Sequence, residues 1–145
     1  MSPWLFSLAI LEGRTIDVFN HGKMQRDCTF IDDIAQGTVR VLDKVAQPNP
    51  AYHSAQPDHA SSHAPYRVYT IGNHTPVALM EFIGSIEQAL GQEAKKNFLP
   101  VQPGDEVVTY ADVLDLQRDV GFEPSTALHE GLEQWVRSSR QFPGL

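Results

Sequence analysis

The chain has 145 residues, of which 41% are hydrophobic and 20% are charged, and its formal net charge is −7. This length and balance predict one globular domain with a hydrophobic core rather than a disordered chain. The negative charge argues against a nucleic-acid-binding protein, because phosphate contacts need clustered lysine and arginine, and no apolar run is long enough to cross a membrane.

Helices and short strands alternate along the chain. Dense apolar residues after Pro3 predict a first helix that ends before Gly13. Runs rich in β-branched and aromatic residues, bounded by turn residues, predict strands at 16–19, 28–31, 67–72 and 97–101. Turns are expected at 20–23, 102–105 and 121–124. Apolar residues with helical spacing predict further helices over 34–45, 75–90, 112–116 and 126–136. This order predicts an α/β or α+β domain.

The most informative stretch is QRDCTFIDDI, residues 25–34, which joins an arginine to a double-acid helix start. Asp32 and Asp33 are expected to cap the helix, where free N–H groups favour negative charge. Arg26 offers a planar fork of five donors that suits a phosphate. The alternative is a salt bridge from Arg26 to Asp27 or Asp33, so the stretch alone leaves a phosphate contact open.

Residues 46–65 predict a long, flexible loop. The segment contains four prolines, scattered alanine and serine, and no apolar periodicity. His53, His59 and His63 lie within it. A metal site is one interpretation, but no cysteine or ordered scaffold accompanies the three histidines, so we expect a solvated insertion.

Cys28 is the one cysteine of the chain. It cannot form an internal disulfide, which is typical of a reducing compartment, and we therefore expect a cytoplasmic protein. Its neighbours are apolar, and we expect a packed thiol rather than a nucleophile.

Five stretches in this order carry a resemblance to a known family. They are AILEGRTIDVFNHG, QRDCTFIDDIAQGTVRVLD, APYRVYTIGNHTPVALMEFI, LPVQPGDEVVTYADVLDL and VGFEPSTALHEGLEQWV. Together they resemble the C-terminal half of NAD-dependent nucleotide-sugar epimerases and dehydratases, which are extended short-chain dehydrogenase/reductases, and most of all the UDP-glucuronate 4-epimerase group. The resemblance implies that residues 1–145 form a single C-terminal substrate-binding region with an α/β fold and an incomplete Rossmann-type sheet.

The resemblance also implies a role for individual residues in binding a UDP-sugar. Arg26 falls where the family places an arginine on the diphosphate, and Asp105 matches the acid that accepts hydrogen bonds from ribose hydroxyls. Phe19 occupies the position whose ring packs on uracil, with backbone groups around Asp17 and Phe19 reading the base edge. Gln102 stands where some relatives carry a second phosphate-binding arginine. From the residues alone, Phe19 as a core aromatic and Asp105 as a turn residue remain alternatives.

The parts that would bind NAD and perform hydride transfer are not expected in this chain. None of the ten glycines has the spacing of a dinucleotide-binding turn. None of the tyrosines has a lysine four residues on, the pairing that lowers a tyrosine pKa in this family; they are Tyr52, Tyr66, Tyr69 and Tyr110. We therefore expect the N-terminal NAD-binding domain to be absent and the chain to be inactive by itself.

Two other functions remain open, and so does the identity of a partner. The chain could derive from a related nucleotide-sugar dehydratase or decarboxylase, or it could be a non-catalytic interaction module. In the family fold, residues 67–72 would pair with strands of the cofactor domain, so this chain would expose a strand edge without them. We therefore expect self-association or association with a companion N-terminal fragment.

Overall fold

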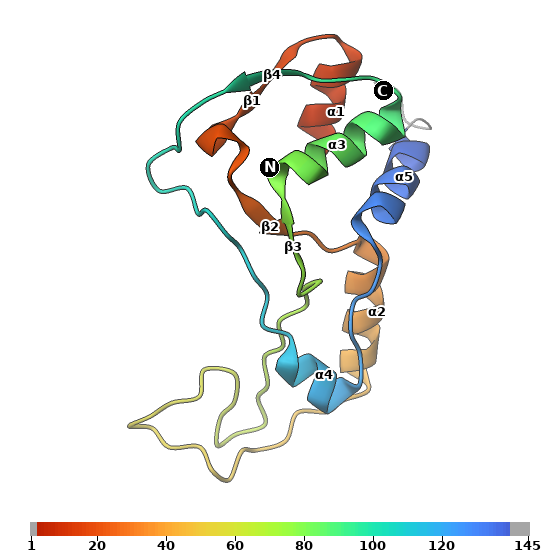
Figure 1. Ribbon diagram of the computed structural model, residues 1–145. Coiled ribbons are helices and arrows are strands. Elements are labelled where there is room, and N and C mark those ends of the chain that lie inside the picture. The colour runs from red at the N-terminus through yellow and green to blue at the C-terminus, as the bar shows by residue number, and fades with distance from the viewer. Residues whose placement is uncertain (1–2, 140–145) are drawn as a thin grey trace.

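Five α-helices and two separate two-stranded sheets make up the computed structural model, which describes residues 3–139 (Figure 1). The helices are α1 (Pro3–Leu11), α2 (Ile31–Leu42), α3 (Leu79–Leu90), α4 (Leu114–Val120) and α5 (Leu128–Ser139). The strands are β1 (Thr15–Val18), β2 (Gln25–Asp27), β3 (Pro76–Ala78) and β4 (Lys95–Phe98), and a 3₁₀ turn η1 covers Phe19–Gly22. The predicted α/β class is confirmed, because one of the two sheets is a parallel pair joined through helices.

The two sheets lie side by side and share no strand. β1 and β4 are parallel, with Asp17 opposite Asn97, whereas β2 and β3 are antiparallel, with Arg26 opposite Val77. A parallel pair needs a long crossover, and here the crossover contains α2 and α3. The chain therefore holds two small pieces of sheet and no extended Rossmann-type sheet within residues 3–139.

The core forms where α3 packs against α1 and α5. α3 has the helical stripe that the sequence predicts: Leu79, Phe82, Ile83 and Ile86 are buried, and the last member, Leu90, is half-buried. The helix ends at Gly91, whose φ of 73° is the left-handed conformation that a side chain disfavours. The predicted helices 3–11 and 126–136 are also confirmed, and the second of them begins two residues later than expected, at Leu128.

α2 begins differently from the prediction. Phe30 is the residue before the helix, and no side-chain cap is formed. Asp32 and Asp33 lie inside the first turn, where their charge still complements the helix dipole. Asp33 is 5% exposed and its Oδ2 accepts a hydrogen bond from the Thr126 backbone N–H at 3.0 Å, so it joins the start of α2 to the segment that leads into α5.

Two predicted strands are wrong. Residues 28–30 form no strand, because β2 lies earlier, at Gln25–Asp27, and α2 already begins at Ile31. Residues 67–72 form no ladder either, apart from an isolated bridge between Arg67 and Ser61. Their composition suits a strand, but no neighbouring strand lies beside them within residues 3–139.

The remaining differences concern the ends of elements. The expected strand 97–101 is β4 at Lys95–Phe98, and the expected helix 112–116 is α4 at Leu114–Val120. Residues 76–78 form strand β3 before α3 begins, because the Leu79 N–H donates to the Met24 carbonyl and the helix starts only there.

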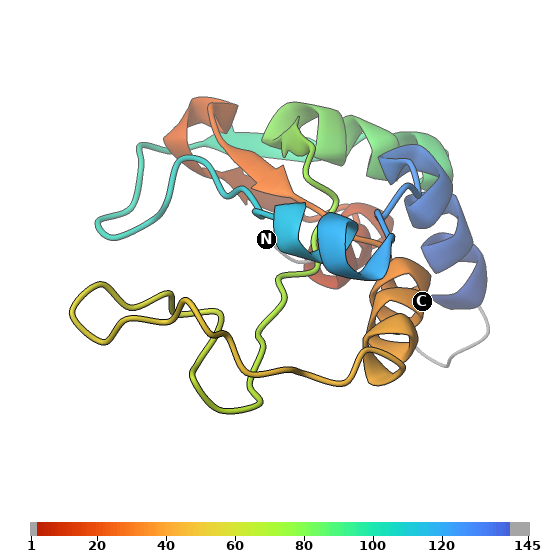
Figure 2. The ribbon, with the colours of Figure 1, turned by 90° about the horizontal axis from the view of Figure 1, so that it is seen from below.

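The loop at 46–65 lies away from the helices in both views (Figures 1 and 2). Residues 46–65 contain no helix and no strand ladder, as predicted for a loop, and the flexibility of this segment stays a prediction. Arg67 links it to α4: its guanidinium lies 2.6 Å from Asp115, 3.1 Å from Asp119 and 3.7 Å from Asp58. A hydrogen bond from Arg118 lowers the pKa of Asp119, and the positive charge of Arg67 lowers it further. Together they outweigh burial, which would raise this pKa.

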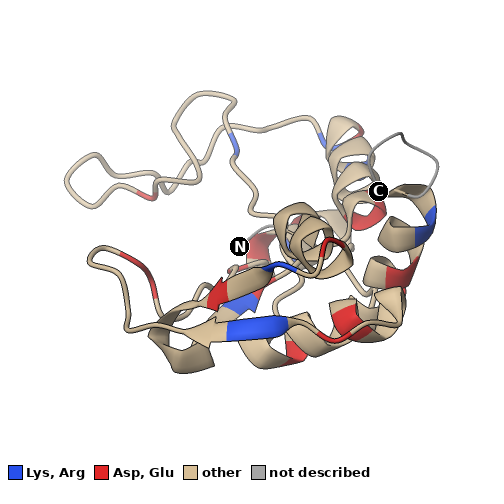
Figure 3. Cartoon of the chain, turned by 90° about the horizontal axis from the view of Figure 1, so that it is seen from above, with Lys and Arg blue, Asp and Glu red and all other residues tan. Residues whose placement is uncertain are grey.

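Basic residues are scattered over several elements and do not gather on one face (Figure 3). Lys95 and Lys96 form the blue segment of β4 in that view, and Arg26 lies on β2. A positive charge for a phosphate must therefore come from single side chains rather than from a basic surface. Within residues 3–139, every helix is too short or too polar to cross a membrane.

Glu87 gives the fold a specific dependence on pH. Burial would raise the pKa of Glu87, but hydrogen bonds from the Lys96 ammonium and the Ala94 N–H hold that pKa below its ordinary value. A lowered carboxylate pKa stabilises the fold above the pKa of the unfolded chain, about 4.3, and this stabilisation is lost as the pH falls through the folded pKa. We expect Glu87→Gln to lower the free energy of unfolding at pH 7 by about 1–3 kcal/mol and to flatten its fall below about pH 4.

Urea unfolding measured between pH 3 and pH 7 checks this expectation. Glu133→Gln is the matched control, because Glu133 is exposed on α5 and should leave both the stability and its pH dependence near wild type. An unchanged pH profile in Glu87→Gln would contradict the role given to the half-buried Glu87 carboxylate.

Candidate functional site

A pocket of about 250 Å³ lies where α1, the β1–η1 junction and β2 meet. Its lining combines five apolar side chains, two of them aromatic, with three charged side chains. The lining residues are Leu5, Phe6, Asp17, Phe19, Met24, Arg26, Leu79 and Asp105. Four of the five residues that the sequence analysis selected therefore line one pocket, although Asp105 follows Arg26 by 79 positions.

Arg26 is held at the pocket by backbone carbonyls. Its Nη1 donates to the carbonyls of Gln25 at 2.9 Å and Val107 at 3.3 Å, and its Nη2 donates to Asp105 Oδ1 at 3.2 Å. The side chain is 19% exposed. A guanidinium has five N–H donors, so this anchoring fixes the plane of the fork and still leaves donors for a ligand. Arg26 forms no ion pair with Asp27 or Asp33, the alternative considered from the sequence.

Asp105 reaches Arg26 from an exposed turn. The predicted turn at 102–105 is confirmed by a hydrogen bond from the Asp105 N–H to the Gln102 carbonyl at 3.1 Å. Gly104 has φ of 82°, a conformation that glycine adopts without strain. Gln102 is exposed on this turn and is not part of the pocket lining, so it differs from the other four selected residues.

Phe19 and Asp17 approach the pocket from the end of β1. Phe19 is half-buried and packs against the core cluster around Val18 and Leu79 while it also lines the pocket, so both interpretations of this ring hold in part. Asp17 is exposed, and its Oδ1 accepts a hydrogen bond from Asn97 Nδ2 at 2.9 Å. This contact joins the two strands of the parallel pair directly beside the pocket.

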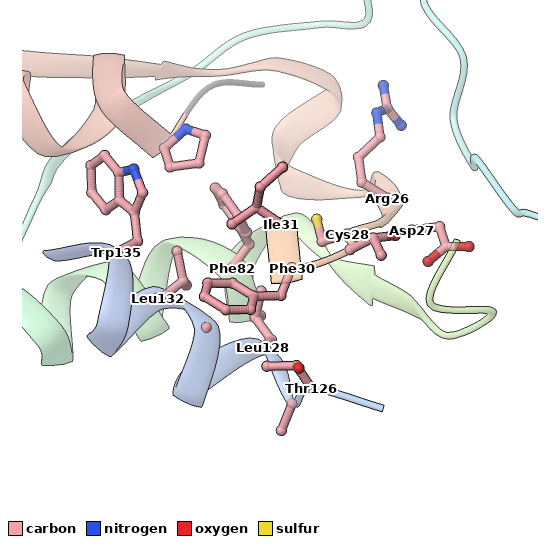
Figure 4. Close-up of a pocket in the computed structure, with 14 residues that line it drawn as sticks. Arg26, Asp27, Cys28, Phe30, Ile31, Phe82, Thr126, Leu128, Leu132 and Trp135 are labelled. Atoms are coloured by element: carbon pink, nitrogen blue, oxygen red, sulfur yellow. The ribbon is translucent and has the colours of Figure 1, made fainter. Parts of the chain in front are cut away.

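A larger cavity, of about 450 Å³, also has Arg26 in its lining (Figure 4). Its walls are mostly apolar side chains from the turn before α2 and from α3 and α5, and they include Phe30, Phe82, Leu128, Leu132 and Trp135. This lining offers few polar partners for a charged ligand, so the smaller pocket is the better candidate for a phosphate compound.

Cys28 also lines the larger cavity and packs against the cluster of Ile10, Phe82 and Leu132. Burial raises the pKa of the Cys28 thiol, and the nearby Asp27 charge raises it further. Both effects favour the neutral thiol, which is a poor nucleophile.

Asp27 is an organising residue that the sequence analysis did not select. Its Oδ1 accepts the Asn73 N–H at 3.1 Å, and its Oδ2 accepts the N–H groups of His74 at 3.1 Å and Ala111 at 3.0 Å. The available signal was strand alternation: if Arg26 faces one side of a strand, Asp27 faces the other and cannot pair with it. Gly72 makes room for this arrangement, since a Cβ on Gly72 would lie 2.2 Å from the Cβ of Ala111.

The pocket brings one positive and two negative side chains together, from Arg26, Asp17 and Asp105. Such a set can bind an anionic group through the guanidinium and neutral hydroxyls through the carboxylates. Within residues 3–139, no group of three or more histidine, cysteine or acidic residues could hold a metal ion. The chemistry that the described site offers is therefore hydrogen bonding and charge pairing.

Curated proteins from bacteria are similar to the chain over almost its full length. It is 48% identical to Protein CapI of Staphylococcus aureus over 136 residues, which are 94% of this chain and 41% of that protein. It is 38% identical to the Probable UDP-glucuronate 4-epimerase of Rhizobium meliloti, over 94% of this chain and 40% of that protein. The chain thus spans about two fifths of the length of these relatives. No protein-family model matches it.

The fold is also similar to that of solved structures. It matches UDP-glucuronic acid 4-epimerase from Bacillus cereus, a variant in complex with UDP-4-deoxy-4-fluoro-glucuronic acid and NAD, with a TM-score of 0.76 and 26% identity. The match covers 97% of this chain and 40% of that one. These comparisons confirm the resemblance drawn from the five sequence stretches, and NAD is the cofactor in such neighbours.

The close packing at Gly72 gives a test of the site's architecture. We expect Gly72→Ala to lower the free energy of unfolding by about 1–3 kcal/mol, because the added methyl group overlaps Ala111 and approaches Asp27 Oδ2 to 3.2 Å. Thermal unfolding followed by circular dichroism measures the change.

Gly84→Ala is the matched control for this substitution. A Cβ on Gly84 meets nothing within 4 Å, and the residue lies inside helix α3. The control should therefore raise the free energy of unfolding by about 0.5–1 kcal/mol, because alanine has a higher helix propensity than glycine. Equal effects of the two substitutions would contradict the close approach of Gly72 and Ala111.

Proposed function

We propose that this chain, which belongs to the NAD-dependent nucleotide-sugar epimerase/dehydratase family, is the C-terminal substrate-binding part of a UDP-glucuronate 4-epimerase. The observation that carries the proposal is the meeting of Arg26, Asp105 and Phe19 in one pocket. A cation, a carboxylate and an aromatic ring suit the diphosphate, ribose and base of a nucleotide. Relatives named UDP-glucuronate 4-epimerase, from Rhizobium and Arabidopsis, support glucuronate as the sugar.

Each side chain has a distinct part in this proposal. The guanidinium of Arg26 donates to diphosphate oxygens while its Nη1 stays anchored on the carbonyls of Gln25 and Val107. Asp105 accepts hydrogen bonds from the ribose hydroxyls, and such bonds to a charged group are stronger than neutral ones. Phe19 packs on uracil, and backbone groups around Asp17 and Phe19 meet the base edge.

The charge of the pocket predicts modest affinity for UDP. One guanidinium faces two carboxylates, those of Asp17 and Asp105, so the lining carries a net negative charge before the diphosphate arrives. Gln102 is neutral and lies outside the lining, so it does not replace a second arginine. We therefore expect this chain to hold the nucleotide weakly without the remainder of a family-length protein.

The residues of this chain do not fit NAD, the cofactor seen in the solved neighbours. None of its ten glycines has the spacing of a dinucleotide-binding turn, and none of its four tyrosines has a lysine four residues on. Epimerisation at the sugar C4 by hydride transfer is therefore a proposal for a longer protein. The part of these residues is to bind and orient the nucleotide, and we expect this chain alone to be inactive.

The exposed side of α2 supports a partner surface. Val39 is 60% exposed and Leu42 is 75% exposed on this helix, and Val45 just after it is 74% exposed. Large apolar side chains in a row are costly in water and are typical of an interface. We propose that residues of a family-length protein that this chain does not span cover this side of α2, and that the isolated chain covers it by self-association.

Binding of UDP tests the proposed function. Isothermal titration should show weak, saturable binding of UDP to the wild-type chain. We expect Arg26→Ala to weaken it by about 10–100-fold and Asp105→Ala by about tenfold, because each removes hydrogen bonds that involve a charged group.

Two substitutions that remove the same kinds of charge outside the pocket serve as controls. Arg137→Ala removes an exposed arginine from α5, and Glu106→Ala removes the exposed acid next to Asp105 in sequence. Both should bind UDP like the wild type. If the wild-type chain binds no UDP, or all four variants bind alike, the proposed nucleotide site is wrong.

Self-association through α2 is tested by sedimentation. We expect the sedimentation coefficient of the wild-type chain to rise with concentration, and Leu42→Lys to reduce that rise, because a charge then faces the partner surface. Leu5→Lys is the control: it changes another exposed leucine, which is 64% exposed on α1, and it should not reduce the rise of the sedimentation coefficient with concentration. A wild-type chain that stays monomeric at every concentration and unfolds cooperatively at high temperature would contradict the proposal.

A further inference from the structure

Arg26 and Asp27 are neighbours on β2 and face opposite sides of the strand. Arg26 faces the pocket, whereas the Asp27 carboxylate accepts three backbone N–H groups: from Asn73, His74 and Ala111. The last of these belongs to the segment that also carries Asp105. The two residues therefore hold the same segment at different points, one at Asp105 and one at Ala111.

The segment 105–111 has no helix or strand of its own. It follows β2 through four contacts that involve β2 backbone or Asp27. The Gln25 N–H donates to the Val107 carbonyl at 2.8 Å, the Thr109 N–H donates to the Gln25 carbonyl at 3.2 Å, the Asp27 N–H donates to Thr109 Oγ1 at 3.2 Å, and Ala111 N–H donates to Asp27. The path of this segment is therefore set by β2 and, at its far end, by the Asp27 side chain.

Asp105 depends on this path for its position. It is exposed on a turn, and the contact that places its carboxylate is the one with Arg26 Nη2 at 3.2 Å. One of the two carbonyls that fix the Arg26 fork, that of Val107, belongs to the same segment, and the other is that of Gln25 on β2. The backbone of Gln25 holds Val107 and Thr109, and the Asp27 side chain holds Ala111 beyond them. Without the contact at Ala111 the segment would be tied to β2 over fewer residues, so the acid and the anchor of the arginine would be held less firmly.

We infer that Asp27 is a positioning residue for the nucleotide pocket: by holding Ala111, it keeps Asp105 in place to accept the ribose hydroxyls beside Arg26. The inference rests on the proposed function, because it needs a nucleotide in this pocket. It explains the residue type as well as the position. Three N–H donors converge on one side chain, and a carboxylate offers two oxygens as acceptors, whereas an amide offers one oxygen and adds donors that face other donors.

The test compares two ligands rather than the strength of one. UDP and 2′,3′-dideoxy-UDP differ only in the hydroxyls that Asp105 is proposed to bind. We expect the wild-type chain to prefer UDP by about tenfold, and Asp105→Ala to abolish this preference. In Asp27→Ala the preference should fall close to one, although the residue lies on the other side of β2 from the pocket. Asp27→Asn, which keeps one acceptor oxygen, should give an intermediate preference.

Asp33→Ala is the matched control. Asp33 is a buried carboxylate that likewise accepts a backbone N–H, from Thr126, whereas Asp27 is half-buried; Asp33 holds the segment before α5 and not the pocket. Loss of stability alone reduces the number of folded molecules and weakens both ligands equally, so Asp33→Ala should keep the wild-type preference. Asp27→Asn serves the same comparison if Asp27→Ala fails to fold.

The outcomes separate this inference from the proposed function. If the wild-type chain binds UDP with the expected preference and both Asp27 variants retain it, the positioning role is wrong and the nucleotide site stands. If the wild-type chain binds neither ligand, or binds both alike, the assignment of Asp105 to the ribose is wrong and the role of Asp27 falls with it. Loss of the preference in the Asp27 variants and its retention in Asp33→Ala would support the inference.

Discussion

Three backbone N–H groups from two separate loops converge on one carboxylate, that of Asp27, and the arrangement around the pocket depends on this convergence. Neither loop forms a ladder of its own, so their partly buried N–H groups need another acceptor. The backbone carbonyls of a strand as short as β2 can accept only a few of the N–H groups of these loops. The side chain of Asp27 extends the reach of β2 beyond its three residues and ties both loops to it.

The two neighbouring side chains of β2 meet different surroundings: Asp27 binds the two loops, and Arg26 faces the pocket. Arg26 lines both a small charged pocket and a larger apolar cavity, and its fork is fixed by two carbonyls and by the carboxylate of Asp105. A phosphate that approaches this fork competes with one carboxylate, Asp105, and leaves the carbonyl contacts intact. In the proposed function an anion can thus bind without loss of the carbonyl contacts that present the guanidinium.

Local pattern predicts the helices of this chain well and its strands poorly. The stripe of α3 and the glycine that ends it are readable in the sequence, because a helix satisfies its own hydrogen bonds. A strand needs a neighbour, and residues 67–72 have the composition of a strand but no partner within residues 3–139. β2, by contrast, holds polar residues that do not read as a strand, and it pairs because β3 lies beside it.

The candidate site shows a similar division. No periodicity relates Arg26 to Asp105, which are brought together by the turn at 102–105 and the segment after it. The resemblance to a family selected both residues, whereas it did not point to Asp27, whose role becomes visible only when the donors around it are known. Residues 67–72 have the composition of a strand but no partner strand within residues 3–139. In a similar way, the exposed side of α2 has apolar residues typical of an interface, but no other described part of the chain covers them. We propose that both surfaces are covered by further residues in a family-length protein or by a second copy of the chain, and neither of them includes a residue that lines the proposed nucleotide pocket.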